Sequence, residues 1–184
     1  MGSEVTGGAA GEATPLRTEQ VSLLLRATNS ALLAETNQMR ASMAAWHPAE
    51  GEWCVKECIG HMQEAERRGF AGRIRRILEE PGRKDPDWNQ VEVQRLRNDC
   101  ARDLDELVSE FREERERSLE LVEGLMNTDL TKACEHERVG LLTIEDLLHE
   151  WIHHDRNHFR QIQANVMAYV WPSMGNSKRF ADID

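Results

Sequence analysis

The sequence predicts an all-α protein, and the most economical architecture for it is a four-helix bundle. Four long stretches carry apolar residues at intervals of three and four, which is the spacing of one helix face. No stretch shows a convincing alternation of apolar and polar residues, the pattern of a half-buried strand. The 184 residues of the chain fit one domain.

The first predicted helix extends from Thr18, a suitable N-cap, to about residue 46, because a residue that precedes proline is disfavoured in helical geometry. Residues 46–53 (WHPAEGEW) predict a turn by their proline and glycine content. The second helix extends from about residue 55 to 80, where a Pro-Gly pair stops it.

The connection after the second helix is long and reaches about Asp99. We expect it either to contain a short helix near residues 91–97 or to cover an opening in the core. The third helix spans about residues 102–125. The fourth begins at Thr143, where Thr-Ile-Glu-Asp supplies an N-cap and early acids, and it continues to about Tyr169.

This pattern divides the chain into three regions. Residues 1–15 are rich in Gly, Ala, Ser and Thr, which predicts a disordered leader. Residues 16–170 hold the helical bundle. Residues 171–184 (WPSMGNSKRFADID) predict an irregular C-terminal segment.

The composition excludes several classes of function. The net charge of −10 and the pI of about 5.2 argue against a general nucleic-acid binder and against a polybasic membrane-surface protein. No apolar run approaches the roughly 20 residues that span a bilayer. Residues 1–15 also lack the basic and apolar regions of a signal peptide, so we expect a cytoplasmic protein.

The cysteines and the arginines favour structural interpretations. Cys54 and Cys58 are four residues apart, which is not the C-x-x-C spacing of redox or zinc motifs, so we interpret them as small core or boundary residues. Residues 67–76 hold five arginines, which we interpret as a solvated helix face with i,i+4 ion pairs. An anion-binding role for these arginines is the alternative.

Four of the seven histidines lie within one ten-residue stretch of the fourth helix. At about 100° per residue, His154 and His158 lie beside the apolar face, whereas His149 and His153 lie on the outer face. An i,i+4 pair places two imidazoles one turn apart on one ridge, where both can bind one metal ion. The pair alone is a weak indicator, because this helix also carries histidines that face solvent.

A third ligand must come from another segment, and His61 at the edge of the second helix's apolar stripe is the natural candidate. Three neutral imidazoles with one open position suit Zn²⁺, Ni²⁺, Fe²⁺ or Cu²⁺. The open position could hold a water of lowered pKa, or a substrate thiolate or carboxylate.

Other polar residues complete the prediction. Asp155 lies on the inward face, so it needs either a ligand histidine to orient or a buried arginine to pair with. Gln161 is one turn beyond the histidine pair and can reach the same place. Glu64 is a possible general base, although a surface position is the simpler interpretation. We interpret His47 and His136 as surface or loop residues.

Two segments resemble the DinB/YfiT-like superfamily. GEWCVKECIGHMQEAER resembles its second-helix signature, Trp-x-h-x-E-h-h-x-His with h apolar, and LTIEDLLHEWIHHDRNHFRQI resembles its fourth-helix signature, His-Asp-x-x-His-x-x-Gln-Ile. The resemblance covers residues 16–170 in motif order and spacing. It implies a four-helix bundle of the DinB/YfiT-like type that holds a divalent metal with His61, His154 and His158.

The resemblance also implies a range of activities. Members include thiol-dependent transferases and isomerases that use low-molecular-weight thiols, the family is often dimeric, and its name does not imply DNA binding. The chain is therefore expected to be a homodimeric metal-dependent thiol transferase or hydrolase that acts on a small molecule. The alternative is a non-catalytic metal-binding or structural bundle that dimerises through a helix face. WPSMGNSKRF matches neither signature and is expected to shape a subfamily-specific pocket.

Overall fold

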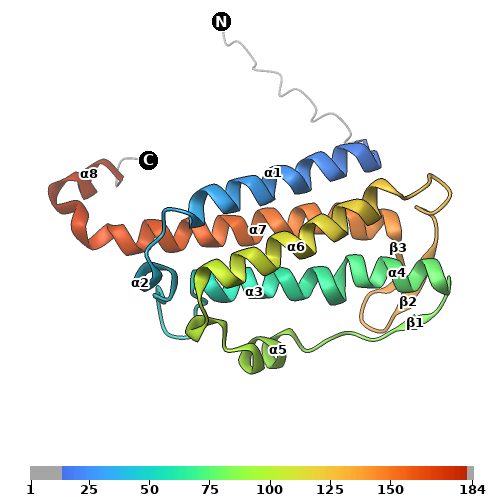
Figure 1. Ribbon diagram of the computed structural model, residues 1–184, viewed down its shortest axis with the longest axis horizontal. Helices are drawn as coiled ribbons and strands as arrows, with labels where there is room; N and C mark the ends of the chain where they lie inside the picture. Colours follow the sequence, from blue (N-terminus) through green and yellow to red (C-terminus); the bar gives the residue numbers. More distant parts are fainter. Residues whose placement is uncertain (1–13, 182–184) are drawn as a thin grey trace, which may run out of the picture.

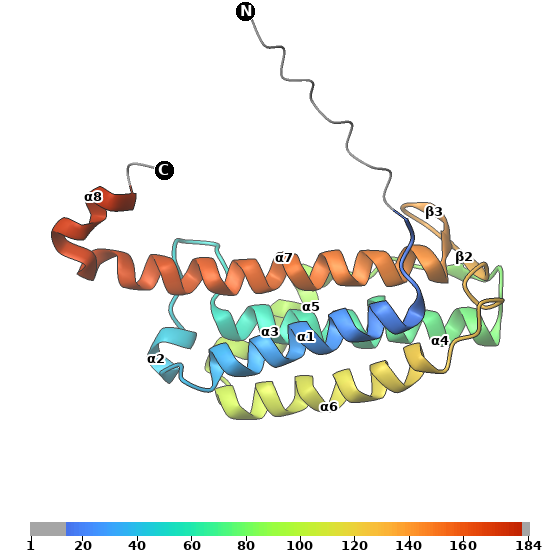
Figure 2. The ribbon, with the colours of Figure 1, turned by 90° about the horizontal axis from the view of Figure 1, so that it is seen from above.

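The computed structural model describes residues 14–181, and within them four long helical segments form a bundle (Figures 1 and 2). They are α1 (Thr18–Thr36), α3 (Val55–Glu64) continued by α4 (Ala71–Glu79), α6 (Leu104–Glu123) and α7 (Ile144–Val170). The packed pairs are α1 with α6, α6 with α3, α3 with α7, and α7 with α1. The predicted all-α bundle is confirmed, and α1 and α3 lie diagonally across it.

The first helix ends earlier than predicted. Instead of continuing toward Pro48, α1 stops at Thr36 and a separate short helix, α2 (Ala41–Ala44), follows. The Thr36 hydroxyl donates to the Leu32 carbonyl, and Asn37 forms the C-cap. Thr and Asn compete with the backbone for hydrogen bonds, so they favour a helix end over a helix interior.

The second helix is interrupted where one continuous helix was predicted. Residues Ala65–Gly69 form a π-helical turn, closed by a hydrogen bond from the Phe70 amide to the Ala65 carbonyl. This wider turn places the Arg67 carbonyl so close to Gly72 that a Cβ there would overlap it. Such turns mark functional sites in many helices.

The absence of strands was a wrong prediction. A small sheet in the order β1-β2-β3 joins β1 (Lys84–Asp85) to β2 (Ala133–His136) in parallel and β2 to β3 (Gly140–Thr143) in antiparallel fashion. Strands of two to four residues are too short to show an alternation in the sequence. The β1–β2 register places Asp85 opposite His136.

The remaining segments carry short helices. The long connection contains α5 (Gln90–Arg97), as predicted, and a 3₁₀ turn (Asp99–Ala101). The described part of the C-terminal segment is more regular than predicted: 3₁₀ turns over Trp171–Ser177, interrupted by a kink at Gly175, lead into α8 (Lys178–Ala181) beyond the end of the bundle (Figure 1). Nearly all of the predicted leader, residues 1–13, lies outside the described residues. Among the described residues, no helix is both long and apolar enough to cross a membrane.

The interior contains two apolar clusters with a polar layer between them. The Trp151 cluster includes Val21, Leu25, Phe70, Ile74, Leu119 and Trp151. The Phe111 cluster includes Leu32, Ile59, Met62, Leu107, Phe111 and Ile162. Along α6, four-residue steps lead from Phe111 through the fully buried Arg115 to Leu119, so one helix face crosses from cluster to cluster through a charged residue.

Candidate metal centre

The three predicted ligand histidines come together in the structure. His61 lies in α3, and His154 and His158 lie on successive turns of α7. The Nε2 atoms of His61 and His154 are 3.1 Å apart, and one ring nitrogen from each of the three residues lies within 4.8 Å of the others. In tetrahedral coordination with Zn–N bonds of about 2.0–2.1 Å, such nitrogens would be about 3.4 Å apart. The donor set therefore fits one transition-metal ion.

The surroundings favour neutral imidazoles at this cluster. Burial, together with the neighbouring histidines, lowers the pKa of His61 to about 3. Burial and His154 lower the pKa of His158 to about 4. A neutral imidazole has a free lone pair on one nitrogen, which is the form that binds metals.

The two α7 histidines differ in their hydrogen bonding. Gln161 Oε1 lies 3.1 Å from His158 Nδ1, so Nδ1–H donates to it and Nε2 keeps its lone pair. The buried Nδ1 of His154 has no hydrogen-bond partner among the described residues, and Asp155 Oδ1 is 4.0 Å from it. A partly buried imidazole whose buried Nδ1 is unpaired and whose Nε2 faces His61 is consistent with a ligand.

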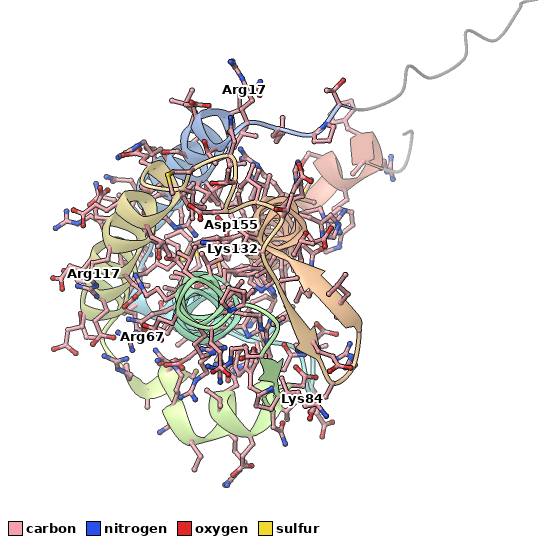
Figure 3. All side chains as sticks on the ribbon, turned by 90° about the vertical axis from the view of Figure 1, so that its right-hand side faces the viewer. Arg17, Arg67, Lys84, Arg117, Lys132 and Asp155 are labelled. Atoms are coloured by element: carbon pink, nitrogen blue, oxygen red, sulfur yellow. The ribbon has the colours of Figure 1, made fainter. Side chains whose placement is uncertain are left out.

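Asp155 has the buried arginine partner that was one of its two predicted roles. Its Oδ2 accepts a hydrogen bond of 2.7 Å from Arg115 Nη1, and Arg115 also binds Glu66 and the Leu25 carbonyl. Burial opposes ionisation of Asp155, but the Arg115 guanidinium outweighs it and holds the pKa of that carboxyl below its ordinary value. Figure 3 shows Asp155 inside the bundle, whereas Arg117 extends outward from it.

Aromatic rings surround the histidines. The Trp53 ring lies 4.9 Å from the His61 ring and stacks on the His158 ring at 6.1 Å, between ring centroids. Trp88 stacks on the other side of His61 at 5.9 Å. These rings fix the imidazole orientations and keep water from the buried side of the cluster.

A cavity of 510 Å³ opens onto the cluster, with His61 and His154 in its wall. The π turn contributes to this wall through Ala65 and Gly69, and Phe70 follows directly. Its polar lining includes Arg73, Asp87, Asn89, His136, Arg138 and Glu150. The long connection lines the cavity through Trp88 and Val91, so it both contains a helix and borders an opening.

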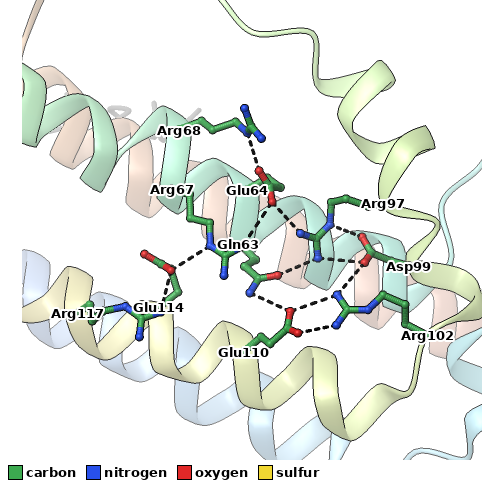
Figure 4. A network of polar contacts seen from close by, with 10 residues as sticks. All are labelled: Gln63, Glu64, Arg67, Arg68, Arg97, Asp99, Arg102, Glu110, Glu114 and Arg117. Carbon is green, nitrogen blue, oxygen red and sulfur yellow. Dashed lines mark hydrogen bonds and ion pairs between the residues drawn. The ribbon is translucent and has the colours of Figure 1, made fainter.

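Several predicted positions differ in the structure. Glu64 is not a surface residue and not part of the cavity wall: it is buried and pairs with Arg67, Arg68 and Arg97 (Figure 4). A carboxylate held by three arginines has a lowered pKa and is a poor general base.

The arginine-rich segment is only partly a solvated face. Arg73 is buried and donates to Asp85 at 2.6 Å, and Arg76 donates to the same carboxylate at 2.8 Å. His136 was expected on the surface but is buried in β2 within the cavity wall. The register of β1 with β2 brings it inward, and no local pattern in the sequence indicates this pairing.

The outer histidines lie where they were expected. His153 is exposed. His149 is partly buried, because its Nε2 accepts a 2.9 Å hydrogen bond from the Leu16 amide. His47 is exposed.

Residue-by-residue reasoning missed the rings of Trp53, Trp88 and Phe70. Trp53 is the first position of the second-helix signature, so the motif itself carried a signal: the tryptophan that begins it covers the histidine that ends it. Trp88 reaches the site from the long connection, for which spacing gives no indication.

Comparison with known proteins identifies the family and supports the fold. The model of the DinB superfamily matches residues 24–162. YfiT from Bacillus subtilis, described as a probable metal-dependent hydrolase with an unusual four-helix bundle topology, has 15% identity, covers 87% of this chain and 93% of its own, and gives a TM-score of 0.75.

A conserved protein from Enterococcus faecalis has 12% identity, covers 85% of this chain and 98% of its own, and gives a TM-score of 0.63. No curated protein matches the sequence significantly. At such identities the structural matches show a shared fold, and the family match extends over most of the described bundle. The chain therefore belongs to the DinB superfamily.

Proposed function

We propose that His61, His154 and His158 hold one divalent transition metal, Zn²⁺, Ni²⁺ or Fe²⁺, and that the chain is a metal-dependent enzyme acting on a small electrophile with water or a low-molecular-weight thiol. The observation that carries the proposal is the convergence of three imidazoles, 3.1 Å apart at the nearest pair, two of which (His61 and His154) line a 510 Å³ cavity. That volume suits a small-molecule ligand.

Each part of the site has a role in this proposal. A bound metal would supply Lewis acidity and would lower the pKa of a coordinated water or thiol. Three protein ligands would leave the metal able to take a water or a substrate atom, and two of these ligands, His61 and His154, line the cavity. Gln161 orients His158, and the Arg115–Asp155 pair fixes the α7 segment between the two ligands.

The proposal includes a small-molecule substrate. The cavity has both apolar and polar walls, from Phe70 and Trp88 to Arg138, which suits a substrate with an apolar body and a polar group. The choice between thiol and water is part of the same proposal.

The proposal also includes a homodimer. Exposed apolar side chains gather at the end of α7 and beyond it, which supports association of two copies there. They are Met167, Val170, Trp171 and Phe180.

Metal content tests the proposal directly. Elemental mass spectrometry on protein purified without chelator is expected to find about one transition metal per chain more in the wild type than in His154→Ala/His158→Ala. His153→Ala is the matched control, because it removes an exposed histidine from the same helix. Equal metal content in all three proteins, or no binding after reconstitution, would contradict the proposal and favour the non-catalytic bundle.

Catalysis needs a separate assay. With the metal identified, the wild type is expected to turn over members of an ester panel or a panel of thiol cosubstrates with small electrophiles. His158→Ala is expected to lose this turnover while keeping its helical circular dichroism. Metal binding without turnover on any panel would support the metal-binding part of the proposal and contradict the enzymatic part.

A further inference from the structure

A second cluster of metal-ligating side chains lies at the N-terminus of α3, two helical turns before His61. His47 lies in the turn that follows α2, Cys54 is the N-cap of α3, and Cys100 lies in the 3₁₀ turn after α5. One ring nitrogen and the two sulfurs lie within 4.8 Å of one another. Three segments far apart in the sequence therefore bring soft donor atoms to one place.

The cysteine of the 3₁₀ turn is held in position by several contacts. Lys56 Nζ, in the first turn of α3, donates to the carbonyls of Arg102 at 2.5 Å and Cys100 at 3.4 Å. Cys100 Sγ lies 3.5 Å from the Ala45 carbonyl, next to the turn that carries His47. Buried Asp99 is bound by Arg97 and anchors the same turn. The donors are therefore preorganised by the surrounding structure.

The histidine also has the neighbour that ligand histidines have in metal sites. Glu57 Oε2 lies 3.0 Å from His47 Nε2, and the same carboxylate oxygen accepts a 2.9 Å hydrogen bond from the Cys54 amide. A carboxylate in contact with a ligand imidazole fixes its orientation and raises its basicity. Glu57 thus connects the histidine to the first turn of α3.

We propose that His47, Cys54 and Cys100 form a second metal site, which binds Zn²⁺ through two thiolates and one imidazole. Two cysteines and one histidine, with a fourth coordination position left to water or another ligand, are a known ligand set for zinc in proteins. Tetrahedral coordination with bonds of about 2.3 Å separates ligand atoms by about 3.8 Å. Since the three donor atoms lie within 4.8 Å of one another, each pair needs to close by about 1 Å at most to reach it.

Proton release accompanies binding at this site. Zinc binding displaces one proton from each cysteine as the two S–Zn bonds form, and no oxidant or reductant is required.

A metal at the second site would stabilise the segment next to the three-histidine cluster. Trp53 directly precedes Cys54 and stacks on the ring of His158. Zinc at the second site would hold residues 46–54 against the 3₁₀ turn, and with them the Trp53 ring. This inference does not depend on the proposed enzymatic function.

Cobalt titration tests the site, because thiolate ligation of Co²⁺ produces a near-ultraviolet charge-transfer absorption that imidazole ligation lacks. The full chain, reduced and freed of metal, is titrated with Co²⁺ as wild type, His154→Ala/His158→Ala and Cys54→Ser/Cys100→Ser. We expect the band in the first two proteins and its loss in the third. Serine is a favourable N-cap, so the third variant keeps the start of α3.

Two single variants complete the design. Cys58→Ala removes a buried thiol one turn from Cys54 and is expected to keep the band. His47→Asn changes an exposed residue and is expected to weaken Co²⁺ binding by more than about tenfold. Absence of the band in the reduced wild type, or its persistence in Cys54→Ser/Cys100→Ser, would overturn the proposal.

Discussion

Two charged networks of this protein use the same chemistry at different depths. The inner network joins Arg115 to Glu66 and Asp155 with none of the three side chains more than 1% exposed. The outer network joins α3, α5 and α6 (Figure 4), and although its carboxylates Glu64 and Asp99 are buried, its peripheral members Arg117 and Glu110 are 52% and 40% exposed. The inner network lies next to the histidine cluster, because Asp155 directly follows His154 in α7.

Depth changes what an ion pair contributes. Charges at the surface are stabilised by water whether or not they pair, so the exposed ion pairs of the outer network contribute little to stability. Inner charges have no water to return to, and removing one partner leaves the others uncompensated. Burial already raises the pKa of Glu66 to about 7 despite the adjacent Arg115. The inner network therefore specifies how α3, α6 and α7 pack around the histidines.

The largest expected effect is that of Arg115→Ala. It leaves two buried carboxylates without a cation and is expected to lower the free energy of unfolding by about 3–5 kcal/mol. The matched control is Arg117→Ala, two residues along the same helix, with an expected loss below about 1 kcal/mol. Urea unfolding of both variants measures the difference. Equal losses would show that depth does not separate the two networks.

Gly60→Ala tests how closely the outer network packs against α3. A Cβ at this position would overlap the carboxylate of Asp99, which is buried and bound by Arg97. We expect a loss of about 3 kcal/mol from this overpacking. In Gly124→Ala the nearest atom to the new Cβ is 3.4 Å away, so thermal unfolding should show little change there. An unchanged free energy of unfolding in Gly60→Ala would mean that the Asp99 carboxylate can move aside at little cost.

Asp85 is an intermediate case, because its carboxylate is buried while Arg76 is 33% exposed. Burial opposes its ionisation, but hydrogen bonds from Arg76 and Arg73 lower its pKa from 3.8 to about 2. This contributes about 2 kcal/mol of stability above the unfolded-state pKa, which is lost as the pH falls toward 2. The stability difference between wild type and Asp85→Asn, measured by urea unfolding, should therefore shrink between pH 5 and pH 2. A constant difference would refute this assignment.

The smallest expected effect is that of Glu110→Gln in the outer network. Its pair with Arg102 is short, 2.6 Å, but partly exposed. We expect a loss below about 1 kcal/mol, which falls further in 1 M salt because exposed charges are screened. Unfolding at low and high salt measures both, and a salt-independent loss above 2 kcal/mol would place Glu110 with the inner group.

The sequence predicted what depends on one helix at a time. The angular positions of His154, His158 and Asp155 followed from the helical repeat, and Thr143 is the N-cap of α7 as expected. The convergence of His61 with the α7 pair followed from the apolar faces meeting. The metal itself stays a prediction, because a cluster of donor atoms does not by itself identify an occupant.

What the sequence could not predict depends on contacts between segments. Burial of His136 requires the pairing of β1 with β2, and the position of Trp88 requires the path of the long connection. The π turn did leave a trace, because the apolar stripe of the second helix steps by five residues from Ala65 to Phe70. A regular helix steps by three or four.

That five-residue step has an evolutionary consequence. A π turn is one extra residue held within a helix without rotating the residues beyond it, so Arg73 and Ile74 keep their facing. Wound as a regular helix, the same chain would turn every later position by about 100°. A deletion of exposed Arg68 would therefore be absorbed: the helix becomes regular and α4 keeps its register. Changes in length at this point remodel the cavity wall while leaving the rest of the fold in place.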